Sequence, residues 1–317
     1  MTAFSGKTFL VAGGAGLIGR HLVASLLAQG ATVTVADNLS SGSQAAVDAF
    51  AGQGRYRFLR HDITEPLDVE ADGIFNLACP ASPVHYQRDP VATWRASVIG
   101  TANLADLAAR RRIRLLQAST SEVYGDPLVH PQVESYFGNV NPIGLRACYD
   151  EGKRAAETLL HDLARLGRLD VRIARIFNSY GPGMRAADGR VVSNFIVQAL
   201  GGQPLTIFGD GTQTRSLCYV EDTVAGLLAL FAGDVGAGPV NIGNPNELTI
   251  ADLARLVIAL TGSQSSVSFL PLPADDPHVR RPDIGRARER LGWTPNVDLR
   301  AGLERTIEYF RREAGTG

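Results

Sequence analysis

The chain has few cysteines, few lysines and no long hydrophobic run, and each scarcity excludes a class of protein. Its 317 residues include three cysteines, which are too few for a disulfide framework and lack the spacing of a metal site. No apolar run approaches the roughly 20 residues of a membrane-spanning helix, and the N-terminus does not resemble a signal peptide. A net charge of −1 gives no electrostatic reason to expect a nucleic acid or a membrane as partner. We therefore expect a soluble, cytoplasmic protein without a metal.

Only two of the 31 basic residues are lysines, and one of them stands in a place that suggests chemistry. Lys153 follows Tyr149 by four positions, so both side chains would share one face of a helix. A free phenol titrates near pH ~10, but a neighbouring ammonium stabilises the phenolate and makes tyrosine usable as a base. The same spacing is common in ordinary surface pairs, so it gains weight only from a second motif.

Short β-branched runs alternate with helical patterns in the first half of the sequence. The expected strands are residues 8–12, 32–36, 56–60, 73–77, 113–117 and 171–176, and the expected helices are 17–29, 91–112 and 146–166. This alternation predicts an α/β fold with a doubly wound parallel Rossmann sheet.

Beyond Phe177 the pattern becomes irregular and rich in glycine and proline. It resumes with a strand at 216–220, a helix at 221–232 and a strand at 239–242, followed by helices at 250–261, 283–291 and 299–312. We expect a larger domain from residues 1–177 plus about 216–243. A smaller, discontinuous α/β lobe would comprise about 178–215 plus 244–317.

A glycine-rich loop follows the first expected strand. Gly13, Gly16 and Gly19 form a Gly-x-x-Gly-x-x-Gly pattern that opens the first helix. Such glycines let the backbone approach a pyrophosphate, which the helix N-terminus binds. Asp37, at the end of the second strand, can accept a hydrogen bond from a ribose 2′-hydroxyl and favours NAD over NADP. The other candidate cofactor contacts lie in this loop or at strand ends: Leu17, Ile18, Asn38, Asp62, Ile63, Leu77 and Ala78.

Longer segments carry a more specific signal. They include GGAGLIG at 13–19, LACPASP at 77–83, STSEVYGDPLVHPQ at 119–132, NPIGLRACYDEGKR at 141–154, RIFNSYGP at 175–182, GDGTQTRSLCYVED at 209–222 and DDPHVRRPDI at 275–284. Through these segments the chain resembles the UDP-glucuronic acid decarboxylases, a group within the extended short-chain dehydrogenase/reductase family. The resemblance covers nearly the whole chain, and the segments at 119–132 and 141–154 are the most specific.

The resemblance implies an NAD-dependent cycle on one sugar ring. UDP-glucuronate would be oxidised at C4, would lose its C6 carboxylate as CO2 and would be reduced again at C4 to UDP-xylose. The larger domain would then bind NAD, and the smaller lobe would bind the nucleotide sugar. Three alternatives remain open: an enzyme that releases UDP-4-keto-pentose, a UDP-glucuronate 4-epimerase, and a non-catalytic NAD-binding sensor. Glu122 argues against the epimerase, because epimerases of this family tend to have small residues there.

The resemblance also implies roles for the catalytic residues. Tyr149 would take the proton of the C4 hydroxyl, Lys153 would lower the pKa of Tyr149, and Thr120 would bond the C4 oxygen. Ser121 and Glu122 would be additions typical of decarboxylases. Glu122 would either oppose the substrate carboxylate as a like charge or, if protonated, supply a proton to C5.

Further residues would bind the substrate. Arg280 would lie near the substrate carboxylate and the phosphates, and a guanidinium suits either by paired hydrogen bonds. The remaining candidates by resemblance are Pro83, Asn178, Arg185, Asn194, Arg215 and Tyr219. Tyr219 would lie either beside the uridine or, equally, in the core. Three positions depart from the family: Gly183 stands where arginine is common, Ser97 where asparagine is common, and Phe137 where tryptophan is common.

Family members usually pair through two helices of each subunit. Residues 91–112 and 146–166 would supply these helices here, and the second carries Tyr149 and Lys153 near its start. We therefore expect a homodimer with twofold symmetry. Alternatively, these helices only cover the sheet.

Overall fold

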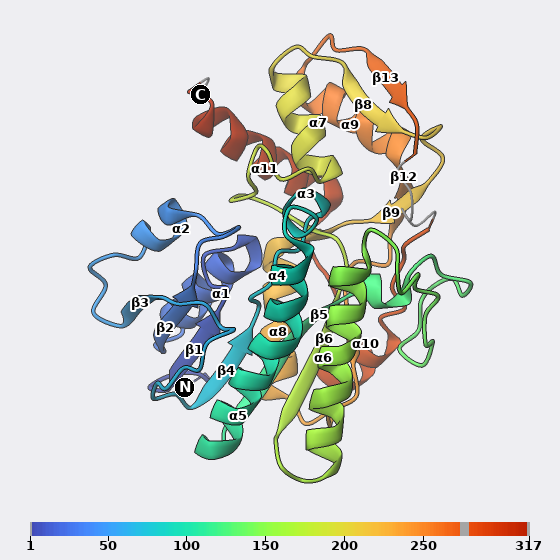
Figure 1. Ribbon diagram of the computed structural model, residues 1–317. Helices are drawn as coiled ribbons and strands as arrows, with labels where there is room; N and C mark the ends of the chain where they lie inside the picture. Colours follow the sequence, from blue (N-terminus) through green and yellow to red (C-terminus); the bar gives the residue numbers. More distant parts are fainter. Residues whose placement is uncertain (1, 273–278, 316–317) are drawn as a thin grey trace.

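A seven-stranded sheet forms the centre of the molecule. The structure, a computed structural model, describes residues 2–272 and 279–315. All strand pairs in the sheet are parallel, in the order β11-β6-β5-β4-β1-β2-β3 (Figure 1). The strands are β1 Thr8–Ala12, β2 Thr32–Asp37, β3 Tyr56–Arg60, β4 Gly73–Asn76, β5 Arg114–Thr120, β6 Val171–Ile176 and β11 Val240–Ile242. The predicted fold class is confirmed.

Helices cover both faces of this sheet, and their apolar sides form two core clusters. One face carries α1 (Leu17–Ala28), α8 (Val220–Ala232) and α10 (Gly285–Leu291). The other face carries α5 (Thr101–Arg111) and α6 (Ala147–Arg165), with α4 (Pro90–Arg95) packed on α6. The central strands β1 and β4 are buried on both faces, so their sequences read as nearly continuous apolar runs, whereas the edge strand β3 is only partly buried.

A second packing centre lies beyond the carboxyl ends of the strands. It gathers α7 (Val191–Leu200), α9 (Ile250–Thr261) and α11 (Leu299–Glu313). Small two-stranded sheets accompany them: β8 (Leu205–Phe208) with β13 (Val267–Leu270), β9 (Thr214–Ser216) with β12 (Glu247–Thr249), and β7 (Ser179–Tyr180) with β10 (Cys218–Tyr219). The division into two domains at the boundaries given above stays a prediction. Two short helices, α2 (Gln44–Asp48) and α3 (Pro83–Tyr86), and a short 3-10 turn at Ser121–Tyr124 lie in the connections.

Two predicted elements need correction. The helix expected over 91–112 is interrupted, because a π-helical turn at Ala96–Gly100 separates α4 from α5. The turn packs closely on α6: a methyl group at Gly152 would lie 3.0 Å from Cβ of Ser97. The strand expected over 216–220 is divided, since the chain changes its pairing partner from β12 to β7 at Leu217 and enters α8 at Val220.

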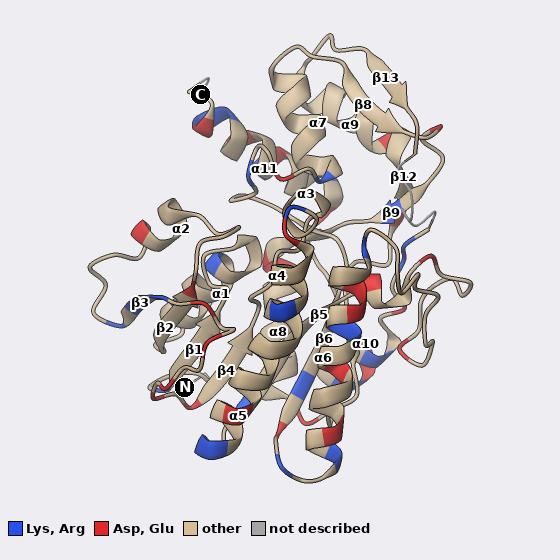
Figure 2. Cartoon of the chain, viewed as in Figure 1, with Lys and Arg blue, Asp and Glu red and all other residues tan. Residues whose placement is uncertain are grey.

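Charged residues of both signs are interspersed over the elements in Figure 2. Within the described ranges, no helix is long and apolar enough to cross a membrane.

Candidate functional site

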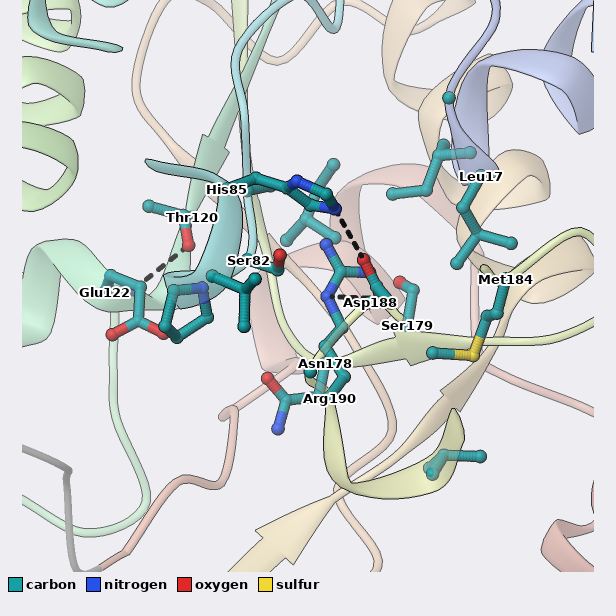
Figure 3. Close-up of a pocket in the computed structure, with 18 of the residues that line it drawn as sticks. Leu17, Ser82, His85, Thr120, Glu122, Asn178, Ser179, Met184, Asp188 and Arg190 are labelled. Carbon is teal, nitrogen blue, oxygen red and sulfur yellow. Dashed lines mark hydrogen bonds and ion pairs between the residues drawn. The ribbon is translucent and has the colours of Figure 1, made fainter. Parts of the chain in front are cut away.

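A cavity of about 570 Å³ opens at the carboxyl ends of the strands, between the sheet and the second packing centre. β1 lies between β4 and β2 in the sheet, so the chain order reverses here. Open parallel sheets bind ligands at such a reversal. Residues from the central sheet and its loops and residues from the second packing centre line the cavity (Figure 3). Its size is typical of a site for a small ligand with a cofactor.

The glycine-rich loop forms one end of this cavity. A methyl group at Gly13 would lie 2.6 Å from the backbone nitrogen of Ala78, so only glycine fits between β1 and the turn after β4. Gly16 is the N-cap of α1, and no side chain in the described part of the chain caps this helix. The helix N-terminus therefore offers its N–H groups to an anion. Gly13, Gly16, Leu17, Ile18 and Leu77 all line the cavity.

The remaining cofactor candidates lie around a smaller hollow of about 80 Å³ beside the loop, which Leu77 also borders. This hollow is lined by Asp37, Asn38, Asp62, Ile63 and Ala78. The Asp37 carboxylate accepts hydrogen bonds from the backbone nitrogens of Ala15 (3.0 Å) and Leu39 (2.8 Å). Burial nevertheless raises its pKa, because these bonds only partly offset desolvation. The Asn38 amide donates to Asp62 at 2.8 Å. A pyrophosphate at the helix end and a ribose at Asp37 fit these residues, as NAD requires.

Tyr149 and Lys153 lie buried on one face of α6, as their spacing predicts. The Lys153 ammonium is 5.8 Å from the centre of the Tyr149 ring and donates to the Ala118 carbonyl at 2.8 Å. The Tyr149 ring stacks on Tyr86, with their centres 5.1 Å apart. Burial raises the pKa of Tyr149, and a hydrogen bond with Thr120 opposes this only partly. In the protein alone, burial therefore outweighs the lowering that we expected from Lys153.

Glu122 is held between two arginines at the end of β5. Its Oε2 accepts from Arg146 at 2.7 Å, and its Oε1 accepts from Arg280 at 2.8 Å. Burial alone would raise the pKa of Glu122, but Arg280 and then Arg146 outweigh it and hold the pKa well below its usual range. Glu122 is therefore ionised, and of the two predicted forms the structure favours the carboxylate.

Arg280 still has an unused donor. Its Nη1 contacts Glu122 and also donates to Oδ1 of Asn178 at 3.1 Å. Its Nη2 is buried and has no hydrogen-bond partner among the described residues. Buried donors in native proteins are nearly always paired, so an unpaired guanidinium nitrogen in a cavity wall indicates an acceptor supplied by a ligand.

Asp150 adds a second carboxyl to this cluster, and it was not foreseen as a site residue. It is buried beside Tyr149, and its Oδ1 has no hydrogen-bond partner among the described residues. Burial and then the charge of Glu122 raise the pKa of Asp150 well above its usual range, because Arg146 and Arg280 compensate only in part. Asp150 is therefore neutral while Glu122 is ionised, so the two carboxyl groups together carry one negative charge.

Most of the predicted substrate residues line the cavity. These are Pro83, Asn178, Arg185, Asn194, Arg215 and Arg280, and the catalytic candidate Ser121 lines it too. Tyr219 is the exception. It is 2% exposed, packs edge-on against Tyr180 and lies under the Arg305 guanidinium, which favours the core alternative over a place beside the uridine. The family segment at 275–284 is described only from 279 onward, and its residues 275–278 lie outside the described residues.

The structure also brings residues to the cavity that the sequence did not single out. Arg146 precedes Tyr149 by three positions, and this helical spacing was the signal that could have found it. Asp188 lies between His85, at 4.0 Å, and Arg190, at 3.3 Å, and these three residues join α3 to the loop before α7 (Figure 3). No local pattern in the sequence links them.

The three departures from the family have different surroundings. The Arg20 side chain occupies the space beside Gly183, where a methyl group would lie 2.7 Å from Cδ of Arg20. Ser97 lies 3.1 Å from the sulfur of Cys79, which borders the cavity. Phe137 is exposed, and its backbone carbonyl accepts from Arg154. Of the three, Gly183 lines the cavity directly.

Comparison with known proteins gives one consistent family. Residues 9–243 match the model of the NAD dependent epimerase/dehydratase family. UDP-glucuronic acid decarboxylase 6 of Arabidopsis thaliana is 54% identical over 98% of this chain and 91% of its own length. UDP-glucuronic acid decarboxylase 1 of Xenopus tropicalis is 52% identical over 97% of this chain and 73% of its own. A solved UDP-glucuronic acid 4-epimerase from Bacillus cereus, in complex with NAD and UDP-4-deoxy-4-fluoro-glucuronic acid, superposes with a TM-score of 0.88 at 26% identity, covering 96% of this chain and 99% of its own.

Proposed function

The chain belongs to the NAD dependent epimerase/dehydratase family, and from this premise we propose that it decarboxylates UDP-glucuronate to UDP-xylose with NAD as cofactor. The observation that carries the proposal is the pairing of Glu122 with Arg146 and Arg280 next to Thr120, Tyr149 and Lys153. Oxidation and reduction at C4 need only Thr120, Tyr149 and Lys153. The two arginines beside Glu122 add positive charge where the substrate carboxylate would bind.

The residues that would hold NAD are those of the glycine loop and the small hollow beside it. The N-terminus of α1 would bind the pyrophosphate, and Asp37 would accept from the adenosine ribose. When bound, NAD supplies reversible oxidation at C4 and, through its cationic nicotinamide, a charge that stabilises a nearby phenolate.

Tyr149 and its neighbours would transfer the proton of the C4 hydroxyl. The Tyr149 phenol would accept the proton of the C4 hydroxyl and later return it. Thr120 hydrogen-bonds the phenol and would orient the C4 oxygen. The Lys153 ammonium, fixed by the Ala118 carbonyl, would stabilise the charged phenolate. Because burial raises the pKa of Tyr149, the phenol depends on these cations to act near neutral pH.

The two arginines and Glu122 act at the other end of the sugar. Nη2 of Arg280 would bind the C6 carboxylate, which then lies close to ionised Glu122. Two neighbouring carboxylates repel each other, and departure of neutral CO2 removes that repulsion. The C–C bond between C5 and C6 breaks, its electron pair remains at C5 as an enolate of the 4-keto sugar, and a proton from water then adds at C5. Ionised Glu122 serves here as charge, not as the proton donor.

The proposal is tested by incubating the protein with UDP-glucuronate and NAD and identifying the sugar product by NMR. UDP-xylose is the expected product. UDP-4-keto-pentose with matching NADH would mean that the cycle stops after decarboxylation. An unreacted substrate would contradict the proposal.

A UDP-glucuronate 4-epimerase is the second candidate, because a solved epimerase that binds a UDP-glucuronate analogue shares the fold. An epimerase must retain the carboxylate. A hexuronate product without CO2 would therefore favour this candidate over the decarboxylase.

A homodimer and a cytoplasmic location are further parts of the proposal. Val91, Trp94 and Ile99, on α4 and the π-helical turn, are exposed apolar side chains beside α6, and a second copy would cover them. Sedimentation of the purified protein tests this; a monomer at micromolar concentration would contradict it. All three cysteines are free thiols, which reducing compartments maintain. Fractionation of the source cells tests the location.

A further inference from the structure

The segment that carries Arg280 is held by a single buried glutamine on one side. The backbone nitrogen of Gln132 donates to the Arg281 carbonyl at 2.8 Å, and the Gln132 carbonyl accepts from Asp283 at 2.9 Å. The Gln132 side chain adds a third bond, because its Oε1 accepts from the backbone nitrogen of Arg281 at 2.8 Å. Gln132 thus makes two hydrogen bonds with Arg281, the residue that follows Arg280, and one with Asp283.

Gln132 is itself fixed in place. It is 1% exposed, and its Nε2 donates to the Val129 carbonyl at 2.9 Å. The Asn241 amide, from β11 of the central sheet, donates to the Gln132 carbonyl at 2.9 Å and to the Asp283 carbonyl at 3.0 Å. Asn241 in turn accepts from the Tyr124 hydroxyl at 2.8 Å. Tyr124 ends the short helical turn that begins with Ser121 and Glu122.

These contacts connect both members of the Glu122–Arg280 pair to one support. Glu122 belongs to the turn that Tyr124 closes, and Arg280 belongs to the segment that Gln132 holds. On its other side, the Arg280 carbonyl accepts from the Ser216 backbone nitrogen at 3.2 Å and its hydroxyl at 3.1 Å. Ser216 therefore holds the backbone of Arg280, and Gln132 holds the backbone of Arg281.

We propose that Gln132 is a positioning residue, which holds Arg280 at hydrogen-bond distance from Glu122 and so completes the site for the substrate carboxylate. The proposal rests on the proposed decarboxylase function. Gln132 lies outside the cavity wall and acts only through Arg280. Its side-chain oxygen is the essential atom, because that oxygen holds the Arg281 backbone.

Three variants test the proposal in the full-length protein. Gln132→Leu removes the side-chain bonds at nearly constant volume, and Gln132→Glu keeps an oxygen that can accept from Arg281. Arg280→Gln removes the residue through which Gln132 acts. We expect Gln132→Leu to lower kcat/KM for UDP-glucuronate by roughly tenfold to hundredfold, as displacement of a site residue by about 1 Å does. Gln132→Glu should recover most of that loss.

The decisive measurement is the double variant. If Gln132 acts through Arg280, Gln132→Leu should cause less than a twofold further loss in the Arg280→Gln background, measured as CO2 release. An equal loss in both backgrounds would overturn the proposal, because a purely structural role is additive. Gln198→Leu is the matched control: Gln198 exchanges two bonds with Thr206 in the second packing centre, so its effect should be the same in both backgrounds.

Failure of the proposed function would be visible separately. Wild-type protein that releases no CO2 would contradict the decarboxylase, whatever Gln132 does. A binding measurement separates the two cases further. Gln132→Leu should weaken UDP-glucuronate binding and leave UDP-glucose binding unchanged within twofold, because only the first ligand has a carboxylate. An equal loss for both ligands would overturn the role of Gln132 at Arg280.

Discussion

Replacing Glu122 with glutamine removes a negative charge from between two buried arginines. Both partners lie within 2.8 Å of the carboxylate, and all three side chains are at most 12% exposed. A glutamine has one oxygen and one amide group in place of two anionic oxygens, so at least one arginine would face an N–H donor. The variant therefore leaves an uncompensated positive charge in the site.

The loss of stability in Glu122→Gln follows from the burial of Glu122 and its two arginines. Breaking a buried ion pair by removing one partner costs about 3–5 kcal/mol. For a chain of 317 residues, that lowers the unfolding midpoint by roughly 5–8 °C. The pKa of Glu122 is depressed, so its stabilising contribution is fully present above the ordinary value near ~4.3 and is lost as the pH falls through the lower folded value. The difference between wild type and Glu122→Gln should accordingly be complete at pH 7.

The same variant should bind a carboxylate ligand better. In Glu122→Gln, the C6 carboxylate of UDP-glucuronate would supply the negative charge that the two arginines have lost, and Glu122 would no longer repel it. Hydrogen bonds to charged groups contribute about 1.5–3 kcal/mol, so the ratio of affinities for UDP-glucuronate over UDP-glucose should rise by roughly 10- to 150-fold. Titration calorimetry measures both affinities, and CO2 release should fall at the same time because the repulsion is lost.

Glu157→Gln is the matched control for this prediction. Glu157 pairs with Arg175 at 2.7 Å with the same degree of burial, and neither residue lines the cavity. This control should lose stability to a similar extent without a change in the affinity ratio. An unchanged ratio in Glu122→Gln, or the same rise in Glu157→Gln, would refute the idea that Glu122 faces the substrate carboxylate.

Three further predictions follow from the site. Tyr149→Phe should abolish CO2 release while NAD binding, measured by calorimetry, stays within about threefold, since the phenol handles only the proton; residual turnover above a hundredth would contradict this. Gly183→Arg should lower the unfolding midpoint for two reasons: the backbone of Gly183 has a φ of +93°, which strains any side chain, and Arg20 fills the adjacent space. Adding Arg20→Ser should recover the part of the loss that comes from Arg20; thermal melts with no recovery at all would disprove the contact. The pKa of Asp150 is raised, so folding favours its protonated form and wild-type stability should fall as the pH rises from about 4 toward that raised pKa. Asp150→Asn should remove this slope, as urea melts across pH would show, and a slope that persists would contradict the assignment.

The sheet was predictable because its central strands, such as β1 and β4, are buried and therefore apolar along most of their length. Strands β1, β3 and β6 begin and end at the expected residues, although the edge strand β3 is only partly buried. The interruption between α4 and α5 was not predictable, because apolar residues continue with helical spacing through 91–112. The shift in hydrogen bonding at Ala96–Gly100 is fixed by tertiary contacts with α6 and Cys79.

The candidate site also has residues that the sequence could predict and residues that it could not. Tyr149 and Lys153 were predictable because both chemistry and helical spacing connect them within four residues. Arg146 is also local to Tyr149, but its ion pair with Glu122 crosses 24 positions and depends on the turn after β5. The sequence left Tyr219 open between the uridine and the core, because a large aromatic residue suits either. Its burial against Tyr180 is a property of the fold and not of its own segment.

Decarboxylation with a complete redox cycle is tested by following CO2 release and NADH absorbance together, with purified protein, UDP-glucuronate, and NAD present or absent. We expect CO2 without net NADH, and a pentose product that NMR identifies as UDP-xylose. CO2 with an equal amount of NADH would contradict the complete cycle, and a hexuronate formed without CO2 would contradict decarboxylation itself.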